Sequence, residues 1–414
     1  MNEQRLAING GPKALSRWPV RRLFTTQEKT AAAALFDRSL ATGDAFGYDG
    51  PDEEAYCKEF ARFLGGGYAD AVNSGTSAVY VALRALELEP FGEVICPPIT
   101  DPGGVMPVPL CNLIPIPADS ALDSYNAGPD QIEARITRHT RAIIVAHIAG
   151  IPAEIGPIME VAKARDLPVI EDCAQAHGAR YKGRHVGTWG TLGAFSTMSG
   201  KHHATAAQGG VVFTRDEALY WMVRRYSDRG KPFNLPATAG NVVCSLNFNL
   251  NDLAACVGRA QLKRLPKIIA ARQKIATLLA RECRRLATVR LMPAPRHAKP
   301  SPWFLFCRLQ LDRLSCDKAT FVKAVAAEGI PVSPSYFHLF TEHPWYKNRA
   351  VFGTSGYPWT CPMYKGNADK LYLTPNIRAT DARHFALSFH ENLTPTHVRR
   401  IVAGLRKVEK AYLK

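Results

Sequence analysis

The stretch RAIIVAHIAGIPAEIGPIMEVAKARDLPVIED, residues 141–172, decides the fold of this chain. It begins with a continuous apolar run over 141–147, continues with a helix-like segment over 152–165 and ends with a second apolar run over 167–172. Continuous apolar runs are typical of strands in a parallel sheet whose two faces are both covered. Strand, helix and strand in this order predict a βαβ unit with two parallel strands.

The same rhythm repeats on both sides of this unit. Upstream, the apolar runs at 93–100 and 112–119 predict two further strands. Downstream, residues 211–214 predict a strand and residues 217–226 a helix. The repetition predicts an α/β fold with a large, mostly parallel, doubly wound sheet. Ligands of such sheets bind at the carboxyl ends of the strands.

The chain divides into three parts on sequence grounds. Residues 1–25 are loop-like and predict an N-terminal arm, and residues 26–266 form the large domain. A strong helix over 253–265 is expected to close at Pro266. Residues 267–414 then supply a linking helix and a smaller C-terminal α/β domain. This domain ends in an amphipathic helix, with Thr394 as its expected N-cap and Pro395 at its first position.

Composition excludes several classes of protein. A chain of 414 residues with 46% hydrophobic content is neither disordered nor fibrous. Its formal net charge of +16 raises the alternative of a nucleic-acid-binding protein. Because the basic residues are spread along the chain and form no stripe interleaved with aromatic residues, we expect a generally basic surface instead.

Cysteine usage and hydropathy bear on the compartment. The ten cysteines include no pair at CxxC spacing, so neither a zinc site nor a disulfide framework is predicted. The N-terminus has no apolar signal-peptide core, and no apolar run approaches the length of a membrane span. We therefore expect a cytoplasmic enzyme without a membrane partner.

One lysine stands out in the stretch FSTMSGKHHATAAQGGVVFT, residues 195–214. Lys201 lies among small and hydroxyl-bearing residues, between a predicted strand and a glycine pair. An amine kept out of water has a lowered pKa and attacks carbonyl carbons. The alternative is an ordinary surface lysine. His202 and His203 are expected to be packing groups, because adjacent positions point in different directions.

Two further positions suit an anionic ligand and a heterocycle. A turn at 73–77 leads into an alanine-rich helix, whose first amides suit a phosphate group, although a plain capped helix starts in the same way. Asp172 ends the strand at 167–172, with Gln175 and His177 close behind. An ionised acid at the floor of a site keeps a heterocyclic nitrogen protonated. The alternative role for Asp172 is an N-cap.

In combination, these pieces resemble the DegT/DnrJ/EryC1/StrS family of sugar and aminocyclitol aminotransferases. The resemblance covers nearly the whole chain, and it implies the type I aminotransferase fold and the cofactor pyridoxal 5'-phosphate. It rests on four motifs in order: Ser74-Gly75-Thr76, Glu171-Asp172-Cys173-Ala174-Gln175-Ala176-His177-Gly178, Phe195-Ser196 with Lys201 and Gly209-Gly210, and Asn247 with Gln261-Leu262-Lys263-Arg264-Leu265.

The resemblance implies a role for each matching residue around the cofactor ring. Lys201 would form the internal aldimine and later act as the general base. Asp172 would pair with the pyridinium nitrogen, which sustains the electron sink of the cofactor. Gln175 would lie against the ring or its 3'-oxygen.

The resemblance also implies how the phosphate is held. Gly75, Thr76 and Ser196 would bind it within one subunit, and Asn247 would reach the phosphate of the neighbouring subunit. The enzyme would then be a homodimer with shared active sites, which two-fold symmetry makes natural.

The implied reaction moves an amino group from an amino acid, Glu or Gln, to a keto-sugar, a sugar nucleotide or a keto-cyclitol. Three positions depart from the family pattern. Asp101 follows Thr100 where an aromatic residue often stacks on the cofactor. Gln208 lies in a loop that is one residue longer than usual, and Asn249 replaces a common arginine.

Other functions stay open at this point. Some family members are cofactor-dependent sugar dehydratases in which histidine replaces the lysine, but Lys201 is present here. A nicotinamide-dependent oxidoreductase lacks its GxGxxG motif in this chain. Outside enzymology, a pyridoxal-phosphate-binding regulator or a basic nucleic-acid-binding protein remains an alternative.

Overall fold

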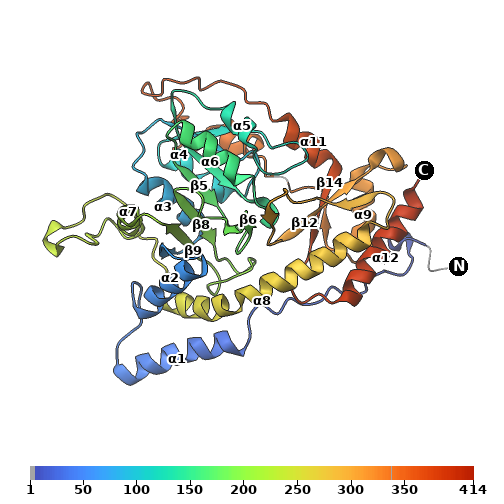
Figure 1. Ribbon diagram of the computed structural model, residues 1–414, viewed down its shortest axis with the longest axis horizontal. Helices are drawn as coiled ribbons and strands as arrows, with labels where there is room; N and C mark the ends of the chain where they lie inside the picture. Colours follow the sequence, from blue (N-terminus) through green and yellow to red (C-terminus); the bar gives the residue numbers. More distant parts are fainter. Residues whose placement is uncertain (1–4, 337) are drawn as a thin grey trace.

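The computed structural model describes residues 5–336 and 338–414. A large α/β domain lies on one side of the molecule and a smaller one on the other (Figure 1). The long helix α8 (Asp252–Cys283) runs beneath both of them. The predicted fold class is confirmed.

The large domain is built on a seven-stranded sheet with the order β1-β9-β8-β5-β4-β2-β3. Its strands are β1 (Tyr68–Val72), β2 (Glu93–Cys96), β3 (Ile114–Pro117), β4 (Thr140–Ala146), β5 (Val169–Asp172), β8 (Leu192–Ser196) and β9 (Gly210–Thr214). Strand β9 runs antiparallel to both of its neighbours, whereas the other pairs are parallel. Strands β4 and β5 pair in parallel around a helix, as the opening stretch predicts.

Helices cover both faces of this sheet because its strands are apolar on both faces. One face packs against α3 (Gly75–Ala85), α4 (Pro107–Leu110) and α7 (Glu217–Ser227). The other face packs against α5 (Pro129–Glu133), α6 (Ile155–Ala164), α2 (Pro51–Phe63) and the first half of α8. The carboxyl ends of the parallel strands remain the open rim at which ligands bind.

The predicted end of a helix at Pro266 is wrong, because α8 continues through this residue. An internal proline removes one backbone hydrogen bond and costs about 3 kcal/mol. Buried side chains on both sides outweigh that cost: Leu262 and Leu265 pack into the large domain, and Leu279 and Cys283 into the small one. Tertiary packing therefore overrides the local signal of the proline.

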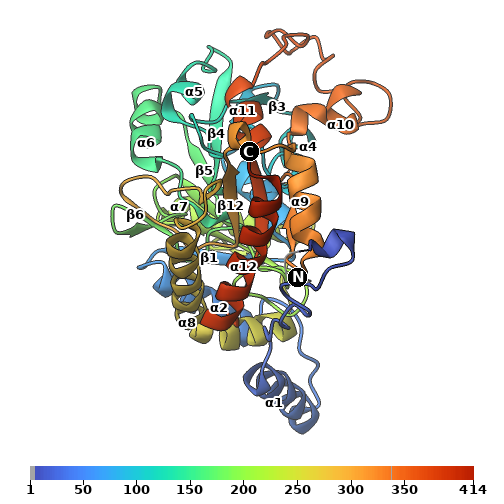
Figure 2. The ribbon, with the colours of Figure 1, turned by 90° about the vertical axis from the view of Figure 1, so that its right-hand side faces the viewer.

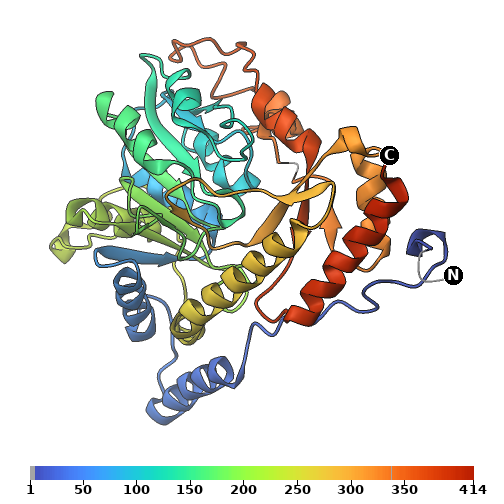
Figure 3. The same ribbon diagram turned by 45° about the vertical axis from the view of Figure 1, so that its right-hand side comes forward.

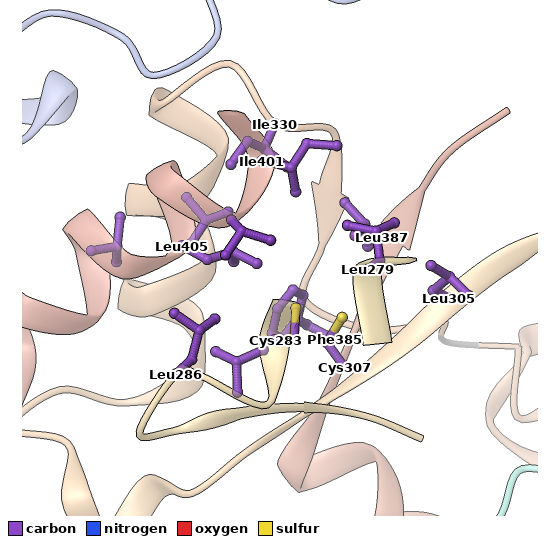
Figure 4. Packing of buried hydrophobic residues seen from close by; sticks show 14 of the residues in the cluster. Leu279, Cys283, Leu286, Leu305, Cys307, Ile330, Phe385, Leu387, Ile401 and Leu405 are labelled. Carbon is purple, nitrogen blue, oxygen red and sulfur yellow. The ribbon is translucent and has the colours of Figure 1, made fainter. Parts of the chain in front are cut away.

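The small domain has its own core and a four-stranded antiparallel sheet in the order β10-β12-β14-β13. The elements are β10 (Val289–Leu291), β12 (Phe304–Leu309), β13 (Val332–Ser333), β14 (His384–Ser388), α9 (Lys318–Ala327) and α12 (Pro395–Tyr412). Figure 4 shows Cys283 of α8 close to Phe385, with Leu405 of α12 in the same apolar cluster. Helix α12 begins at Pro395 with Thr394 as its N-cap, as predicted.

A third, small sheet links the two domains. It has the order β11-β6-β7, with β6 (Arg180–Tyr181), β7 (Arg184–His185) and β11 (Ala298–Lys299). These strands are not predicted from the sequence, because a strand of two residues is too short to show an alternating pattern.

The N-terminal arm follows the small domain before it reaches α1 (Thr26–Thr42), as Figure 3 shows. Helix α1 begins with a capping box between Thr25 and Glu28. It projects below the rest of the molecule in Figure 2, and its buried Leu35 packs against Cys256 and Val257 of α8. Its outward side chains include Leu40, which is 82% exposed.

Both edges of the large sheet are covered. The edge strand β3 has the sequence Ile-Pro-Ile-Pro. The Ile114 amide donates to the carbonyl of Gly92, the residue before β2, and the Ala118 amide donates to the carbonyl of Cys96 at the end of β2. Residues 344–372, which include α10 (Pro344–Lys347) and precede α11 (Pro375–Arg383), pack over this edge. The Tyr364 hydroxyl donates to the buried Glu93 carboxylate over 2.9 Å. At the other edge, the amide of Asn73 donates to the Phe248 carbonyl over 2.7 Å.

Two other sequence predictions can be compared with this fold. Within residues 5–336 and 338–414, no helix is both long enough and apolar enough to cross a membrane. All ten cysteines are free thiols, and six of them, including Cys173 and Cys307, are buried within the apolar clusters.

Candidate active site

The predicted site residues gather at the carboxyl rim of the large sheet. Asp172 is the last residue of β5, and Ser196 is the last residue of β8. Lys201 lies in the loop that joins β8 to β9, and α3 begins at Gly75 directly after β1. Parallel strands end at one rim, so the sheet topology itself brings these segments together.

The Lys201 side chain is only 6% exposed. Its Nζ atom lies 3.6 Å from the centroid of the Trp303 ring. Burial lowers the pKa of this amine to about 8, while the charges of Asp172 and Asp101 act in the opposite direction. More of this amine than of an exposed lysine is therefore unprotonated and nucleophilic near neutral pH.

The Asp172 carboxylate has one oxygen in use and one available. Its Oδ1 accepts a hydrogen bond from the Ala174 amide over 3.0 Å, as in an N-cap. Within the described residues, Oδ2 accepts no hydrogen bond. A Cβ atom on Gly104 would lie 2.7 Å from Oδ2, so only glycine leaves room at that position. Burial raises the pKa of Asp172, and Lys201 is among the groups that oppose the rise.

The start of α3 forms a cradle of backbone amides. The Ser74 side chain accepts from the Ser77 amide over 3.0 Å, which leaves the amides of Gly75 and Thr76 at the helix start without a partner inside the helix. A Cβ on Gly75 would lie 2.6 Å from the Cβ of Ser196, so the helix start is pressed against the end of β8. The three predicted phosphate-binding residues therefore lie together.

Gln175 connects the rim to the small domain. Its Oε1 accepts from the Ala149 amide over 2.7 Å, and its Nε2 donates to the Tyr336 hydroxyl over 2.7 Å. Tyr336 and Trp303 belong to the small domain and were missed by sequence analysis. Nothing in the sequence around them marks them, because single aromatic residues are too common to identify a site.

Asp101 occupies the position where the resemblance leads us to expect an aromatic residue. It is exposed, and its Oδ1 accepts from the Gly103 amide over 3.0 Å at the start of a short 3-10 turn. Burial lowers the pKa of His338, and the charge of Asp101 partly offsets this effect. The rings of His338 and Tyr336 are 4.8 Å apart, so aromatic groups near Asp101 come from the small domain.

Asn247 is the one predicted site residue that stands apart in this chain. It is exposed on the segment between α7 and α8, and its Oδ1 accepts from the Asn249 amide over 3.0 Å. Among the described residues, no hydrogen bond joins it to Lys201 or to the other predicted site residues. Within this chain, the side chain of Asn247 contacts Asn249 and is not part of the rim.

The two histidines after Lys201 are buried, as expected of packing groups. His203 Nε2 lies 2.6 Å from the Tyr56 hydroxyl, and its ring is stacked on Tyr56. His202 is fully buried, at 5.8 Å from the ring of His177. Burial lowers the pKa of all three imidazoles, so they are neutral at physiological pH.

A cluster of His147, Glu171 and Cys173 has donor atoms within 4.8 Å of one another. Protein groups already occupy the ligand atoms of two of its members. His147 Nε2 donates to Glu171 over 3.0 Å, and His147 Nδ1 accepts from the Ala153 amide. The Glu171 carboxylate also accepts from the amides of residues 187, 189 and 190. This cluster supports the rim and is not a metal site.

Removing the Glu171 carboxylate is expected to destabilise the fold. Glu171→Ala leaves one buried amide, two partly buried amides and one buried imidazole without an acceptor, so the free energy of unfolding should fall by about 3–5 kcal/mol. Denaturant unfolding measures this, with the exposed Glu160→Ala as the matched control. Equal stabilities of the two variants would show that the acceptor role is wrong.

The chain is similar to known proteins over most of its length. Residues 27–406 match the model of the DegT/DnrJ/EryC1/StrS aminotransferase family. The chain is 31% identical to GDP-perosamine synthase of Caulobacter vibrioides over 298 residues, which cover 69% of this chain and 78% of that protein.

Solved structures show the same fold. An aminotransferase from Psychrobacter cryohalolentis is 27% identical, with a TM-score of 0.79 over 94% of this chain and 97% of that one. DesV of S. venezuelae is 25% identical, with a TM-score of 0.81 over 96% and 99%. With the rim geometry and the family match in agreement, the chain belongs to the DegT/DnrJ/EryC1/StrS aminotransferase family, whose cofactor is pyridoxal 5'-phosphate.

Proposed function

We propose that this enzyme moves an amino group from an amino acid, Glu or Gln, to the keto group of a keto-sugar, a sugar nucleotide or a keto-cyclitol. The observation that carries the proposal is the meeting of three groups at one rim. These are a buried amine on Lys201, a carboxylate oxygen of Asp172, and the amides at the start of α3; neither that oxygen nor those amides have a hydrogen-bond partner among the described residues.

The residues at the rim fit pyridoxal 5'-phosphate. When bound, the cofactor supplies a carbonyl for amines and an electron sink for the substrate carbanion. Gly75, Thr76 and Ser196 would hold its phosphate, and Asp172 would pair with its ring nitrogen. Lys201 would supply the amine that binds the cofactor and the base that moves a proton at the substrate carbon.

A cavity of about 470 Å³ supports a polyhydroxylated acceptor, and its lining includes Gly200 and Trp303, the neighbours of Lys201. Its lining also includes Tyr336, His338, Ser335 and Ser388. Aromatic faces pack on the C–H faces of a sugar or cyclitol ring, and hydroxyl groups bind its hydroxyls. The names of the relatives agree with this class, since GDP-perosamine synthase acts in the chemistry of a nucleotide-linked sugar.

Product analysis tests the reaction. The purified enzyme is loaded with pyridoxal phosphate and incubated with glutamate or glutamine and a panel of keto-sugars and keto-cyclitols. We expect mass spectrometry to show a gain of nitrogen in one acceptor. Loss of water without nitrogen would support the sugar-dehydratase alternative. A salt-dependent shift of DNA with no amino transfer would support a nucleic-acid-binding protein.

We further propose a homodimer in which Asn247 completes the phosphate site of its partner. The exposed position of Asn247 and the exposed apolar side chains of Leu40 and Leu246 support this arrangement. We propose that residues 26–266 bind the cofactor and that residues 267–414 cover it. The free thiols support a reducing, cytoplasmic location.

Mixed dimers test the shared site. Lys201→Ala and Asn247→Ala each inactivate both sites of their own dimer under this proposal. Unfolding and refolding an equal mixture produces hybrids in which one site has both native residues, so activity should recover to about a quarter of the wild-type value by statistical pairing. A mixture that stays inactive, although sedimentation shows that hybrids form, would contradict the sharing of Asn247.

A further inference from the structure

The backbone of the catalytic lysine is held by residues from outside the large domain. Arg21 of the N-terminal arm donates from Nη1 to the Gly200 carbonyl over 3.0 Å and from Nη2 to the Lys201 carbonyl over 2.6 Å. The Trp303 Nε1 also donates to the Gly200 carbonyl, over 2.9 Å. Two consecutive carbonyls of the loop therefore receive three donors.

These donors belong to a closed network. The Arg21 Nε lies 2.9 Å from Glu391 Oε1, and the Arg272 Nε lies 2.9 Å from Glu391 Oε2. Arg272 also donates from Nη1 to the Trp303 carbonyl over 3.0 Å. The network thus runs from Arg21 through Glu391 and Arg272 to Trp303, and it returns to Arg21 at Gly200.

The network joins four parts of the chain. Arg21 comes from the arm, Arg272 from α8, Trp303 from the residue before β12, and Glu391 from the segment after β14. The arm is fixed beside Glu391, because the Arg22 amide donates to the Asn392 side chain over 2.9 Å and His390 Nε2 lies 2.9 Å from the Pro19 carbonyl. The arm is thereby placed next to the active site.

The charged groups of this network are buried, so each of them needs its hydrogen-bond partners in place. The Arg272 side chain is 2% exposed and the Glu391 side chain 7%. Buried charges are costly unless they are paired and hydrogen-bonded. An arginine can hold two carbonyls and a carboxylate at once because its donors form a rigid fork, whereas lysine presents a single point charge.

We propose that Arg21, Glu391, Arg272 and Trp303 are positioning residues that fix the Lys201 backbone and present its amine to the face of Trp303. When Lys201 is not bonded to the cofactor, its amine rests 3.6 Å from the centroid of that ring, where the electron-rich face attracts the ammonium form. The inference rests on the proposed function of Lys201. It adds the N-terminal arm to the groups that set the reactivity of this lysine.

Two measurements separate positioning from folding. Pyridoxamine 5'-phosphate has no aldehyde, so its dissociation constant reports the pocket without the lysine bond. The rate at which Lys201 bonds to pyridoxal 5'-phosphate, trapped with borohydride and read by mass spectrometry, reports the placement of the amine. Small misplacements of a reacting group cost up to about 100-fold in rate.

We expect Arg21→Lys to slow covalent attachment by about 10-fold to 100-fold while pyridoxamine phosphate binds as it does to the wild type. Glu391→Gln, which keeps the shape but loses the charge, should slow attachment in the same direction. The matched control is Arg22→Lys, because Arg22 is exposed and uses only its backbone in the contact to Asn392.

Two results would overturn the network. One is an Arg21→Lys attachment rate equal to that of the wild type, and the other is an equal loss of pyridoxamine phosphate binding and thermal stability, which would indicate a purely structural role. A wild-type protein that takes up neither cofactor form contradicts the proposed function instead. In that case, the network is tested by the rate of Lys201 acylation in the cofactor-free protein. An acylation rate in Arg21→Lys equal to that of the wild type would also overturn the network.

Discussion

Replacing Lys201 by alanine is expected to lower kcat/KM for amino transfer by about 10⁴-fold or more. A general base alone contributes about 10²-fold to 10⁴-fold, and this amine also serves as the nucleophile that bonds to the cofactor. The side chain is 6% exposed and lies against Trp303, so no other described lysine in the same setting is available to replace it.

Covalent trapping is the most direct measurement. Borohydride should attach pyridoxal phosphate to residue 201 in the wild type and not in Lys201→Ala, and the absorbance band of the lysine-bound cofactor should disappear. Lys58→Ala is the matched control, because that side chain is 68% exposed. Trapped cofactor on another lysine, with wild-type turnover in Lys201→Ala, would show that the assignment is wrong.

Asp172→Asn is expected to reduce kcat/KM by about 10²-fold to 10³-fold, the range observed when one preorganised electrostatic contact to the reacting group is removed. Asparagine keeps the hydrogen bond from the Ala174 amide but cannot hold a proton on the ring nitrogen. The variant should fold normally, because it removes a buried charge whose pKa burial already raises. Its kinetic defect should therefore appear without loss of stability.

A pH series distinguishes this charge effect from a shape effect. Burial lowers the pKa of Lys201 to about 8, and the negative charge of Asp172 opposes that shift. Removing the charge should therefore lower the pKa of Lys201 further, so that acylation of its amine in the cofactor-free protein begins at lower pH. Asp101→Asn, an exposed carboxylate, is the control with the smaller expected shift. An unchanged or raised pKa in Asp172→Asn would contradict the electrostatic argument.

The sequence predicted the elements that are determined by residues close together in the chain. The apolar runs of β4 and β5, the N-cap at Thr394 and the acid at the end of β5 are all set by neighbours in the chain, and the structure confirms them. Pro266 misled the prediction because its effect depends on what packs against α8 on both sides of it.

Long-range partners of the site lay beyond sequence reasoning. Tyr336 meets Gln175 across 161 positions, and Arg21 meets the Lys201 carbonyl across 180. No local period or motif connects such pairs, since the packing of the arm and the small domain brings them together. The resemblance supplied the order of the motifs within the large domain, but it did not indicate what approaches the rim from outside that domain.

The sequence of the edge strand β3 bears on aggregation of the chain during translation. The amides of Ile114 and Ala118 donate toward β2, inside the sheet. The residues that follow Ile114 and Ile116 are Pro115 and Pro117, which have no N–H to donate outward. An edge without outward donors cannot easily add a strand from another molecule, which is a route to aggregation and amyloid. Residues 344–372, which later cover this edge, are made more than 200 positions after it. We therefore expect Pro115→Val with Pro117→Val to aggregate more during synthesis, because the valine amides would leave this edge open until residues 344–372 cover it.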